Sequence, residues 1–346
     1  MKILMFSSDP RLREEARLDS RQARQGSEVS KRIEKYRERL EKLDIILLDR
    51  SRGRFLRFFK GYFEARRLLK REKYDVMTAQ EPEHWFLAWL LSRKFTIPWQ
   101  MQIHTDIFSP HYVHHSVMHK GRVWLAKFLI PRASCVRAVS ERIKKSINRP
   151  DAVVLPIFSA RKGGRGVNLR EKYPGYDFYI LMVSRLTKEK NIQLALSAVH
   201  ELSKKYPKIL LVIVGGGLLA RYIESDENIK LEGWQSELDG YYRSADCFLL
   251  TSNYEGYGMA AVEALQYGLP VVMTDVGVAG EIVKNGVNGL VVPAGDKELL
   301  VVALERLYED RELRGRLSQA AKNLKIQTEE EYLKLYVESL KSCAQR

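Results

Sequence analysis

The sequence predicts an α/β protein made of two doubly wound, parallel-sheet domains. Short apolar runs alternate with amphipathic helical stretches along the chain, and this βαβ rhythm is typical of parallel sheets covered by helices on both faces. The rhythm occurs twice, in two halves of similar length. A chain of 346 residues is also long enough for two domains of ordinary size.

Glycine and proline mark the boundary between the two halves. A glycine-rich run at 162–166 and the Pro174-Gly175 pair lie within 158–176, which reads as a linker. We therefore predict one Rossmann-like domain over 1–160 and a second Rossmann-like domain over 161–327. A last helix, about 328–346, is expected to pack back on the first domain.

The elements follow from the apolar runs and the helical periodicity between them. In the first half we predict strands at 3–7, 45–48, 76–79, 99–103, 135–139 and 153–155, and helices near 28–42, 55–72, 83–94, 121–130 and 140–147. In the second half we predict strands at 180–184, 210–214, 230–231, 247–250, 271–273 and 289–292, and helices near 191–205, 259–267, 296–309 and 311–324. Ligands of such folds bind at the carboxyl ends of the strands.

Composition excludes several classes of protein. No apolar run reaches the roughly 20 residues of a membrane-spanning helix, and the N-terminus reads as a first strand and is too short for a signal peptide. The three widely spaced cysteines, Cys135, Cys247 and Cys343, suggest neither a disulfide framework nor a metal site. We expect a cytoplasmic protein in a reducing compartment.

Residues 255–263, Glu-Gly-Tyr-Gly-Met-Ala-Ala-Val-Glu, are the most informative stretch of the chain. They join a buried strand to a helix, and the glycines allow a ligand to approach the backbone closely. The backbone N–H groups of Gly258, Met259 and Ala260 would point at that ligand, and a helix N-terminus suits an anion. One of Glu255 and Glu263 could then address a sugar and the other a ribose, with phosphate between them. Two ordinary solvated glutamates are the alternative.

Two cations follow the first strand of the second half. Arg185 and Lys190 lie on its strand-to-helix loop, where Asn191 looks like the N-cap of the next helix. Arginine as a fork and lysine as a point charge suit a diphosphate. Lys188, which lies between them, is expected to be solvated. A basic surface loop with no ligand is the alternative.

The next two ligand-end loops are candidates for the nucleotide. Gly216, in the middle of a triple glycine, could admit a base or ribose against the backbone, or could belong to a tight turn. The spacing is not that of a dinucleotide fingerprint. Gln235 follows the third strand and is a further donor-site candidate. Its neighbour Trp234 either packs on the base or belongs to the core.

In the first half, His104 and Asp106 end a strand at the ligand edge of the sheet. His104 is a catalytic candidate, although a lone histidine is more often structural. Four further histidines at 111–119 have only Asp106 nearby in sequence and no close second acid, so we predict no metal site. No two aspartates are two positions apart, so the Asp-x-Asp metal clamp is absent. Arg, Lys and a helix N-terminus would stabilise the leaving group instead.

Together these residues resemble glycosyltransferase family 4, whose members are retaining enzymes with the GT-B fold. Glu255 and Glu263 resemble the paired-glutamate motif of that family, Arg185 and Lys190 resemble its diphosphate-binding pair, and His104 resembles its donor-sugar histidine. The resemblance covers the whole second half and, less strongly, the first half from about residue 74. The sequence departs from the family at one point, where a charged segment at 9–25 replaces the usual Gly-Gly loop and only Gly26 and Ser27 precede the helix. Gly26, Ser27 and Asp106 are weak candidates for the acceptor side of the site.

The resemblance implies two domains that face a central cleft, with the acceptor bound by 1–160 and the donor bound by 161–327. It also implies a hexose transfer from a UDP- or GDP-linked sugar, with no metal and no other cofactor. Glu263 would hold the ribose, and Arg185, Lys190 and the 258–260 backbone would stabilise the departing diphosphate. The acceptor hydroxyl would attack the face that the diphosphate leaves, so no protein nucleophile is required. Glu255 would contact the sugar hydroxyls, and His104 would orient the sugar or polarise its hydroxyl. A non-catalytic nucleotide-sugar or nucleic-acid binding protein is the alternative of another class.

The charge of the chain points to an anionic partner for the first half. Residues 1–160 contain 33 Lys and Arg against 18 Asp and Glu, whereas residues 161–346 contain 25 of each kind. Two stretches, 52–73 and 119–145, combine basic and aromatic residues in the manner of helices that lie on anionic membranes. We favour a lipid-linked or glycolipid acceptor at the inner face of the cell membrane over a soluble small-molecule or polysaccharide acceptor. No nucleic-acid-binding motif is visible, so nucleic acid is a disfavoured partner.

Overall fold

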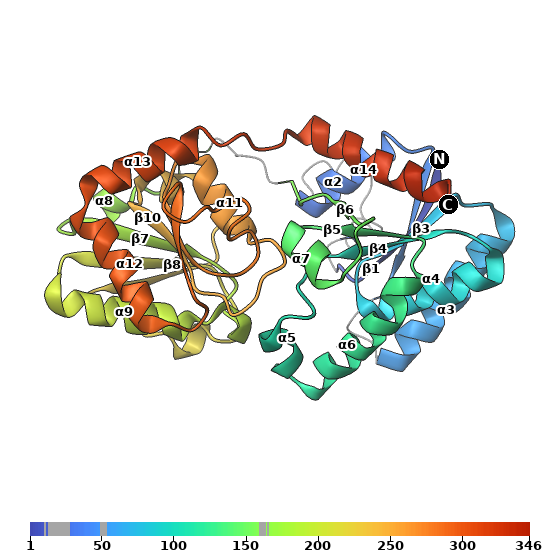
Figure 1. Ribbon diagram of the computed structural model, residues 1–346, viewed down its shortest axis with the longest axis horizontal. Coiled ribbons are helices and arrows are strands. Elements are labelled where there is room, and N and C mark those ends of the chain that lie inside the picture. Colours follow the sequence, from blue (N-terminus) through green and yellow to red (C-terminus); the bar gives the residue numbers. More distant parts are fainter. Residues whose placement is uncertain (10–11, 13–27, 49–53, 159–163, 165) are drawn as a thin grey trace. The chain divides into compact units, whose positions relative to one another are not determined.

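The chain folds into two compact α/β units, each described here by itself (Figure 1). The structure is a computed structural model that describes residues 1–9, 12, 28–48, 54–158, 164 and 166–346. Unit 1 consists of Met1–Pro156 and Thr328–Arg346, and unit 2 consists of Ile157–Gln327. The two predicted βαβ series therefore correspond to two separate sheets.

Unit 1 is built on a six-stranded sheet in the order β2-β1-β3-β4-β5-β6. All of its strand pairs are parallel. Its strands are β1 (Lys2–Ser7), β2 (Lys42–Leu47), β3 (Val76–Ala79), β4 (Trp99–Ile103), β5 (Cys135–Ala138) and β6 (Val153–Val154). Its helices are α2 (Glu28–Arg37), α3 (Arg54–Arg71), α4 (Pro82–Phe95), α5 (Pro110–His114), α6 (Val117–Leu129), α7 (Glu141–Ser146) and α14 (Glu329–Ala344).

Unit 2 repeats this architecture with the strand order β12-β11-β10-β7-β8-β9. Its pairs are again parallel. The strands are β7 (Phe178–Val183), β8 (Ile209–Val214), β9 (Ile229–Gly233), β10 (Cys247–Leu250), β11 (Val271–Thr274) and β12 (Gly289–Val292). The helices are α8 (Leu169–Lys172), α9 (Ile192–Lys205), α10 (Asp239–Ser244), α11 (Met259–Gln266), α12 (Lys297–Glu309) and α13 (Arg311–Lys322).

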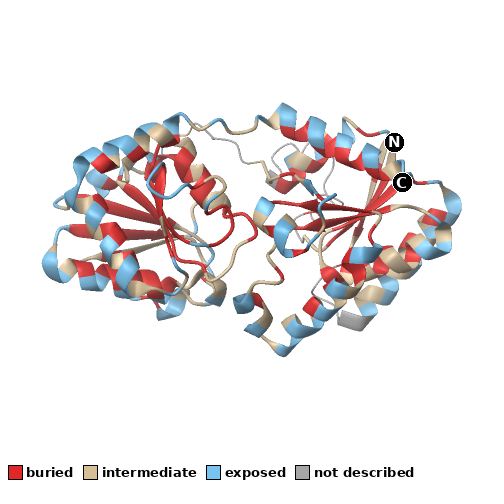
Figure 2. Cartoon of the chain, viewed as in Figure 1, coloured by how far each residue is buried: buried red, intermediate tan, exposed pale blue. Residues whose placement is uncertain are grey.

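The central strands are buried on both faces, as expected of a sheet covered by helices (Figure 2). Every residue of β8 and β10 is buried, which explains why these strands read as unbroken apolar runs in the sequence. The helices bury one stripe each. In α9, for example, the buried positions recur at three- and four-residue intervals, as the amphipathic pattern predicts.

The C-terminal helix α14 packs on unit 1 and begins with a capping box formed by Thr328 and Glu331. Its Tyr336 ring stacks on Tyr36 of α2, with 4.3 Å between the ring centroids. The Tyr332 hydroxyl lies 2.7 Å from the hydroxyl of Tyr36. The last helix of the chain thus packs as part of unit 1.

The structure corrects the expectation that the cysteines form no disulfide. Cys135 of β5 and Cys343 of α14 are paired, with their Cα atoms 5.7 Å apart and 208 residues between them in sequence. Sequence spacing cannot reveal this pair, because α14 returns to unit 1 only after the whole of unit 2. Cys247 is a buried free cysteine.

One local expectation is also wrong, and a second is confirmed only in part. The helix predicted near 28–42 ends at Arg37, and Lys42 already belongs to β2, where it lies opposite Lys2 of β1. Asn191 does stand at the N-cap position of α9, but its side chain makes no capping hydrogen bond. Its left-handed backbone (φ 45°) lets the amide reach Asn253 instead, with 3.0 Å from Nδ2 to Oδ1.

Candidate active site

The candidate active site of unit 2 lies where the strand order reverses. The chain leaves β7 for β8 on one side and later returns to add β10 on the other side of β7. The loop after β7 (184–191) and the loop after β10 (251–258) therefore start from neighbouring strands at the same edge of the sheet. Ligands of open α/β sheets bind at such a switch point.

The two loops are joined by backbone and side-chain hydrogen bonds. The Asn253 N–H donates to the Glu189 carbonyl at 2.8 Å. The Thr251 hydroxyl donates to the carbonyls of Lys190 and Asn191, at 3.0 Å each. Because Thr251 is buried, these bonds fix the end of β10 against the turn that carries Lys190.

Lys190 and Glu255, which the sequence placed on separate loops, form an ion pair between Nζ and Oε1. Only 17% of the lysine side chain and 12% of the glutamate side chain are exposed. The Ser252 hydroxyl also donates to Glu255 Oε1, at 2.7 Å. A partly buried pair of this kind is held in one geometry far better than a surface pair.

The third part of the site is the N-terminus of α11. Gly258 is the N-cap residue and has φ 94°, a left-handed conformation that favours glycine. Met259 and Ala260, the first residues of the helix, are half-buried, and their N–H groups belong to the first turn, which has no intrahelical acceptor. This end of the helix therefore offers donors and a positive partial charge to an anion.

Glu263 lies one turn into α11 and accepts a hydrogen bond from the Tyr242 hydroxyl at 3.0 Å. Burial and the neighbouring Glu263 carboxylate raise the pKa of Tyr242 well above its ordinary value, so the phenol remains a donor. The sequence analysis did not identify Tyr242, because nothing in the local sequence of α10 indicates that its hydroxyl reaches α11.

Arg185 lies apart from this cluster. Its side chain is 76% exposed, and its guanidinium is 3.4 Å from Glu189 of the same loop. Lys188 is exposed, as expected. The structure therefore brings Lys190 and Glu255 into contact but leaves Arg185 on the solvent side of the loop.

Two glycines of the triple glycine after β8, Gly215 and Gly217, are required because the neighbouring backbone leaves no room for a Cβ. A Cβ on Gly215 (φ 141°) would lie 1.9 Å from the Ser184 carbonyl oxygen, and one on Gly217 (φ 153°) would lie 2.5 Å from the Leu186 oxygen. At Gly216 a Cβ would meet only Trp234, at 3.9 Å. The tight-turn interpretation thus explains two glycines and leaves Gly216 open.

The loop after β9 has an exposed tryptophan. Trp234 is 76% exposed, so it does not belong to the core. Gln235 is half-buried and donates to the Glu232 carbonyl, with 2.9 Å between Nε2 and O. Its side chain supports the loop after β9 in this structure.

Gly277 is a site residue that the sequence analysis missed. It has φ 54°, and a Cβ there would lie 2.4 Å from the Tyr257 carbonyl oxygen and 2.9 Å from the Glu255 Cβ. The neighbouring Val278 N–H donates to the same carbonyl at 2.9 Å. The loop after β11 thus supports the backbone that carries Glu255.

In unit 1, His104 follows β4 and lines a hollow of about 250 Å³ together with Glu81, Trp85, Tyr112 and Arg122 among others. Burial, with contributions from Arg137 and Arg32, lowers the pKa of His104 to about 3. The imidazole is therefore neutral at physiological pH, as a group that accepts a proton or a hydrogen bond must be.

Its tautomer follows from neighbouring groups. Arg137 can only donate, and its Nη1 lies 3.1 Å from Gln102 Oε1, which fixes the orientation of that amide. His104 Nε2 faces the same oxygen at 3.4 Å and must therefore be the donor. Nδ1 of His104 is then left as the acceptor nitrogen.

The remaining acceptor-side candidates are less informative. Asp106 accepts a hydrogen bond from the Ser146 hydroxyl at 3.2 Å, and burial raises its pKa above the ordinary value. Gly26 and Ser27 lie outside the described residues, as does most of the charged segment 9–25. Among the described residues, no group of three His, Cys, Asp or Glu side chains is placed to hold a metal ion.

Comparisons with known proteins match both halves. Residues 169–324 match the family described as glycosyl transferases group 1, and residues 20–153 match the glycosyl transferase 4-like domain. An α-1,3-galactosyltransferase of Escherichia coli, which acts on UDP-Gal and α-D-GlcNAc-diphosphoundecaprenol, is 26% identical over 280 residues, 73% of this chain and 71% of the enzyme. The lipopolysaccharide core mannosyltransferase LpsB of Rhizobium meliloti is 27% identical over 245 residues, 62% of this chain and 68% of the enzyme.

Solved structures show the same fold over the whole chain. The sucrose-phosphate synthase of Thermosynechococcus elongatus superposes with a TM-score of 0.73 at 17% identity, covering 99% of this chain and 97% of that one. The HepE protein of Anabaena, solved in complex with UDP, superposes with a TM-score of 0.68 at 20% identity, covering 99% and 100%.

Proposed function

Because the chain belongs to glycosyltransferase family 4 and has the two-domain GT-B fold of that family, we propose that it is a retaining hexosyltransferase. The donor is a nucleotide diphosphate sugar, and the acceptor is a hydroxyl group. Two similar proteins support the donor class, since the E. coli enzyme uses UDP-Gal and the Anabaena protein was solved with UDP.

The observation that carries the proposal is the cluster at the switch point of unit 2. Lys190, Glu255 and the N-terminus of α11 come from two loops that are bonded to each other, and Glu263 lies one turn further along. The Lys190 charge and the helix N-terminus suit a diphosphate, and two carboxylates on either side of them suit hydroxyl groups. A site of this composition binds a charged, hydroxyl-rich ligand.

In the proposed reaction these groups stabilise the diphosphate as the bond to the sugar breaks. Lys190 and the N–H groups at 258–260 stabilise the negative charge that develops on the leaving oxygen. Glu263 holds the ribose, and Glu255 binds the sugar hydroxyls while it compensates the charge of Lys190. His104, with Nδ1 as acceptor, orients a sugar hydroxyl.

We assign this stabilisation to protein groups and propose that no divalent ion is needed. Lys190 is already fixed by Glu255, and Arg185 is long, exposed and on the same loop. Its guanidinium can swing toward a diphosphate and bind it in fork geometry.

For the acceptor we propose a lipid-linked or glycolipid hydroxyl. The name of the E. coli relative gives a diphosphoundecaprenol-linked acceptor, and a relative from Acholeplasma laidlawii, 32% identical over 172 residues, is an α-monoglucosyldiacylglycerol synthase. The basic first domain suits an anionic membrane. A soluble acceptor is the runner-up, favoured by the solved sucrose-phosphate synthase with the same fold.

The donor site is tested by titrating UDP- and GDP-sugars into Lys190→Gln and its matched control Lys188→Gln in a calorimeter. We expect the first to weaken binding at least tenfold, because it removes the buried cation, and the second to leave binding unchanged, because Lys188 is exposed. Transfer should persist in a chelator. Equal affinity in both variants would refute the site, and activity that requires added Mg²⁺ or Mn²⁺ would refute metal independence.

A further inference from the structure

Unit 1 presents an aromatic surface made by α3, α4 and α6. Successive ring contacts run from Phe59 to Phe58 (6.0 Å between centroids), Phe86 (5.9 Å), Trp89 (5.6 Å) and Phe128 (5.3 Å). Trp124 then stacks on the Phe128 ring at 6.2 Å. We call these six residues the aromatic strip. Its ring contacts join α3, α4 and α6.

The two ends of the aromatic strip are exposed. Phe59 is 57% exposed and Trp124 is 70% exposed, although both are large apolar side chains. Further exposed apolar residues flank them on the same helices: Leu56, Phe63, Val117 and Met118. Scattered exposed apolar residues need no explanation, but a group of this size on adjoining helices marks an interaction surface.

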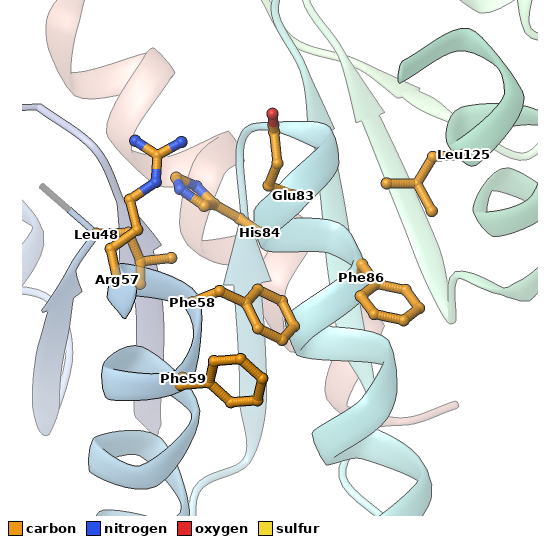
Figure 3. A pocket seen from close by; sticks show the side chains of 8 residues that line it. All are labelled: Leu48, Arg57, Phe58, Phe59, Glu83, His84, Phe86 and Leu125. Atoms are coloured by element: carbon orange, nitrogen blue, oxygen red, sulfur yellow. The ribbon is translucent and has the colours of Figure 1, made fainter. Parts of the chain in front are cut away.

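A hollow of about 320 Å³ opens beside the aromatic strip (Figure 3). Phe58 and Phe59 of α3 and Phe86 of α4 line it, together with Leu48 and Leu125. Among the described residues of its lining, the acidic side chain is that of Glu83, which is compensated by Arg122, whose nitrogens lie 3.0 and 2.8 Å from Oε1. The hollow is therefore suited to an apolar ligand.

Basic side chains surround this apolar surface. Arg57 lines the hollow, and Lys60, Arg67, Lys120 and Lys127 are exposed on α3 and α6. Arg132 lies over the Phe128 ring, 3.9 Å from its centroid. Exposed aromatic rings within a cationic rim match the interface of an anionic bilayer, where rings enter the headgroup region and cations bind phosphates.

We propose that the aromatic strip seats unit 1 on an anionic lipid bilayer and that the hollow receives one hydrocarbon chain of a bilayer lipid. Among the described helices, none is long and apolar enough to cross a bilayer, so seating is at the surface. This deepens the proposed function by naming the partner of unit 1. The rings pack on one another, which leaves few open faces for bases to stack on and makes RNA a poorer fit.

The test is sedimentation with vesicles of phosphatidylcholine containing phosphatidylglycerol, compared with pure phosphatidylcholine. The variant Phe59→Ser/Trp124→Ser should bind the anionic vesicles at least tenfold more weakly, because each ring contributes apolar burial. Leu218→Ser/Tyr222→Ser is the matched control, since Leu218 and Tyr222 are 82% and 58% exposed in unit 2. It should bind as the unaltered protein does.

Trp124 also supplies a direct readout. Lipids brominated along their chains should quench tryptophan fluorescence in the unaltered protein, and Trp124→Phe should lose most of that quenching. Lys60→Gln/Lys127→Gln should weaken binding to anionic vesicles several-fold and leave the small binding to neutral vesicles unchanged.

The hollow is tested by titrating short-chain phosphatidylglycerol below its micelle concentration. We expect saturable binding, weakened at least tenfold by Leu125→Trp, which narrows the hollow, without loss of nucleotide-sugar binding. Three outcomes would each overturn the proposal. They are equal vesicle binding by Phe59→Ser/Trp124→Ser and its control, dimerisation through the aromatic strip in the absence of lipid, and RNA binding that competes with vesicles. Failure of donor binding in unaltered protein would instead refute the proposed function and leave this surface standing.

Discussion

The neutral His104 gives a pH dependence whose size follows from the structure. Burial lowers its pKa to about 3, whereas a histidine in an unfolded chain titrates near 6.5. As the pH falls below about 6.5 the unfolded chain takes up a proton that the folded chain refuses. The contribution of this group to stability is therefore intact above pH 6.5 and is lost progressively down to about pH 3.

Between pH 7.5 and 5.5 this difference destabilises the fold by about 1.4 kcal/mol, since one pKa unit corresponds to about 1.4 kcal/mol. The charges near the imidazole of His104 lower its pKa, as burial does. Arg137 and Arg32 both lower the pKa of His104, and Gln102 offers its nearby oxygen without a negative charge. His104→Gln removes the titrating group and should remove this contribution to the pH dependence of the unfolding free energy.

The measurement is the free energy of unfolding from urea titration at both pH values, for the unaltered protein and for His104→Gln. The carboxylates and the other six histidines are common to the two proteins, so their titrations cancel in the comparison. We expect the unaltered protein to lose about 1.4 kcal/mol more than the variant. Equal losses, or an imidazole NMR signal of His104 that titrates near pH 6.5, would refute the reasoning.

Two further predictions concern packing. Gly277→Ala should destabilise unit 2 by about 1–3 kcal/mol and lower the turnover rate, because the new Cβ would meet Tyr257 and Glu255. Gly286→Ala is the control. Gly286 also has a positive φ (73°) but open space for a Cβ, so this variant carries the backbone strain without the clash. Cys343→Ser should lower the unfolding free energy of the oxidised protein by up to about 5 kcal/mol, since it opens a loop of 208 residues. Reductant should then affect only the unaltered protein, and alkylation of three free thiols before reduction would contradict the pairing.

The fold could be predicted from the sequence because its signals are local. Runs such as 76–79, 99–103 and 247–250 are bounded by turns and coincide with the observed strands. The helix near 28–42 was predicted too long, because its polar end and the edge strand β2 share a weak pattern. Edge strands are half-exposed, so they lack the unbroken apolar run of a central strand.

The candidate site could be predicted only in part. Lys190 and Glu255 were recognisable because each follows a strand, and the carboxyl ends of parallel strands share one edge. Their contact, however, depends on the strand order, which the sequence does not state. Gly277 and Tyr242 were missed for the same reason, since each supports a residue from a different loop or helix.

The disulfide and the tautomer of His104 depend on still longer-range contacts. Both involve α14, whose tyrosines lie beside Arg137. The Arg137 guanidinium is 5.1 Å from the Tyr336 ring centroid, and its Nη2 is 3.0 Å from the Leu155 carbonyl oxygen. These contacts hold a fully buried cation whose charge would otherwise be costly.

This arrangement connects the C-terminal helix with the candidate catalytic group. Tyr336 also accepts a hydrogen bond from Gln102 Nε2, at 3.1 Å, while Arg137 donates to Gln102 Oε1. The amide is thus fixed at both ends, and it is this amide that leaves His104 with Nδ1 as the acceptor nitrogen. Helix α14 therefore does more than complete the core of unit 1. Through Tyr336 and Gln102 it helps determine which ring nitrogen of His104 can accept a proton.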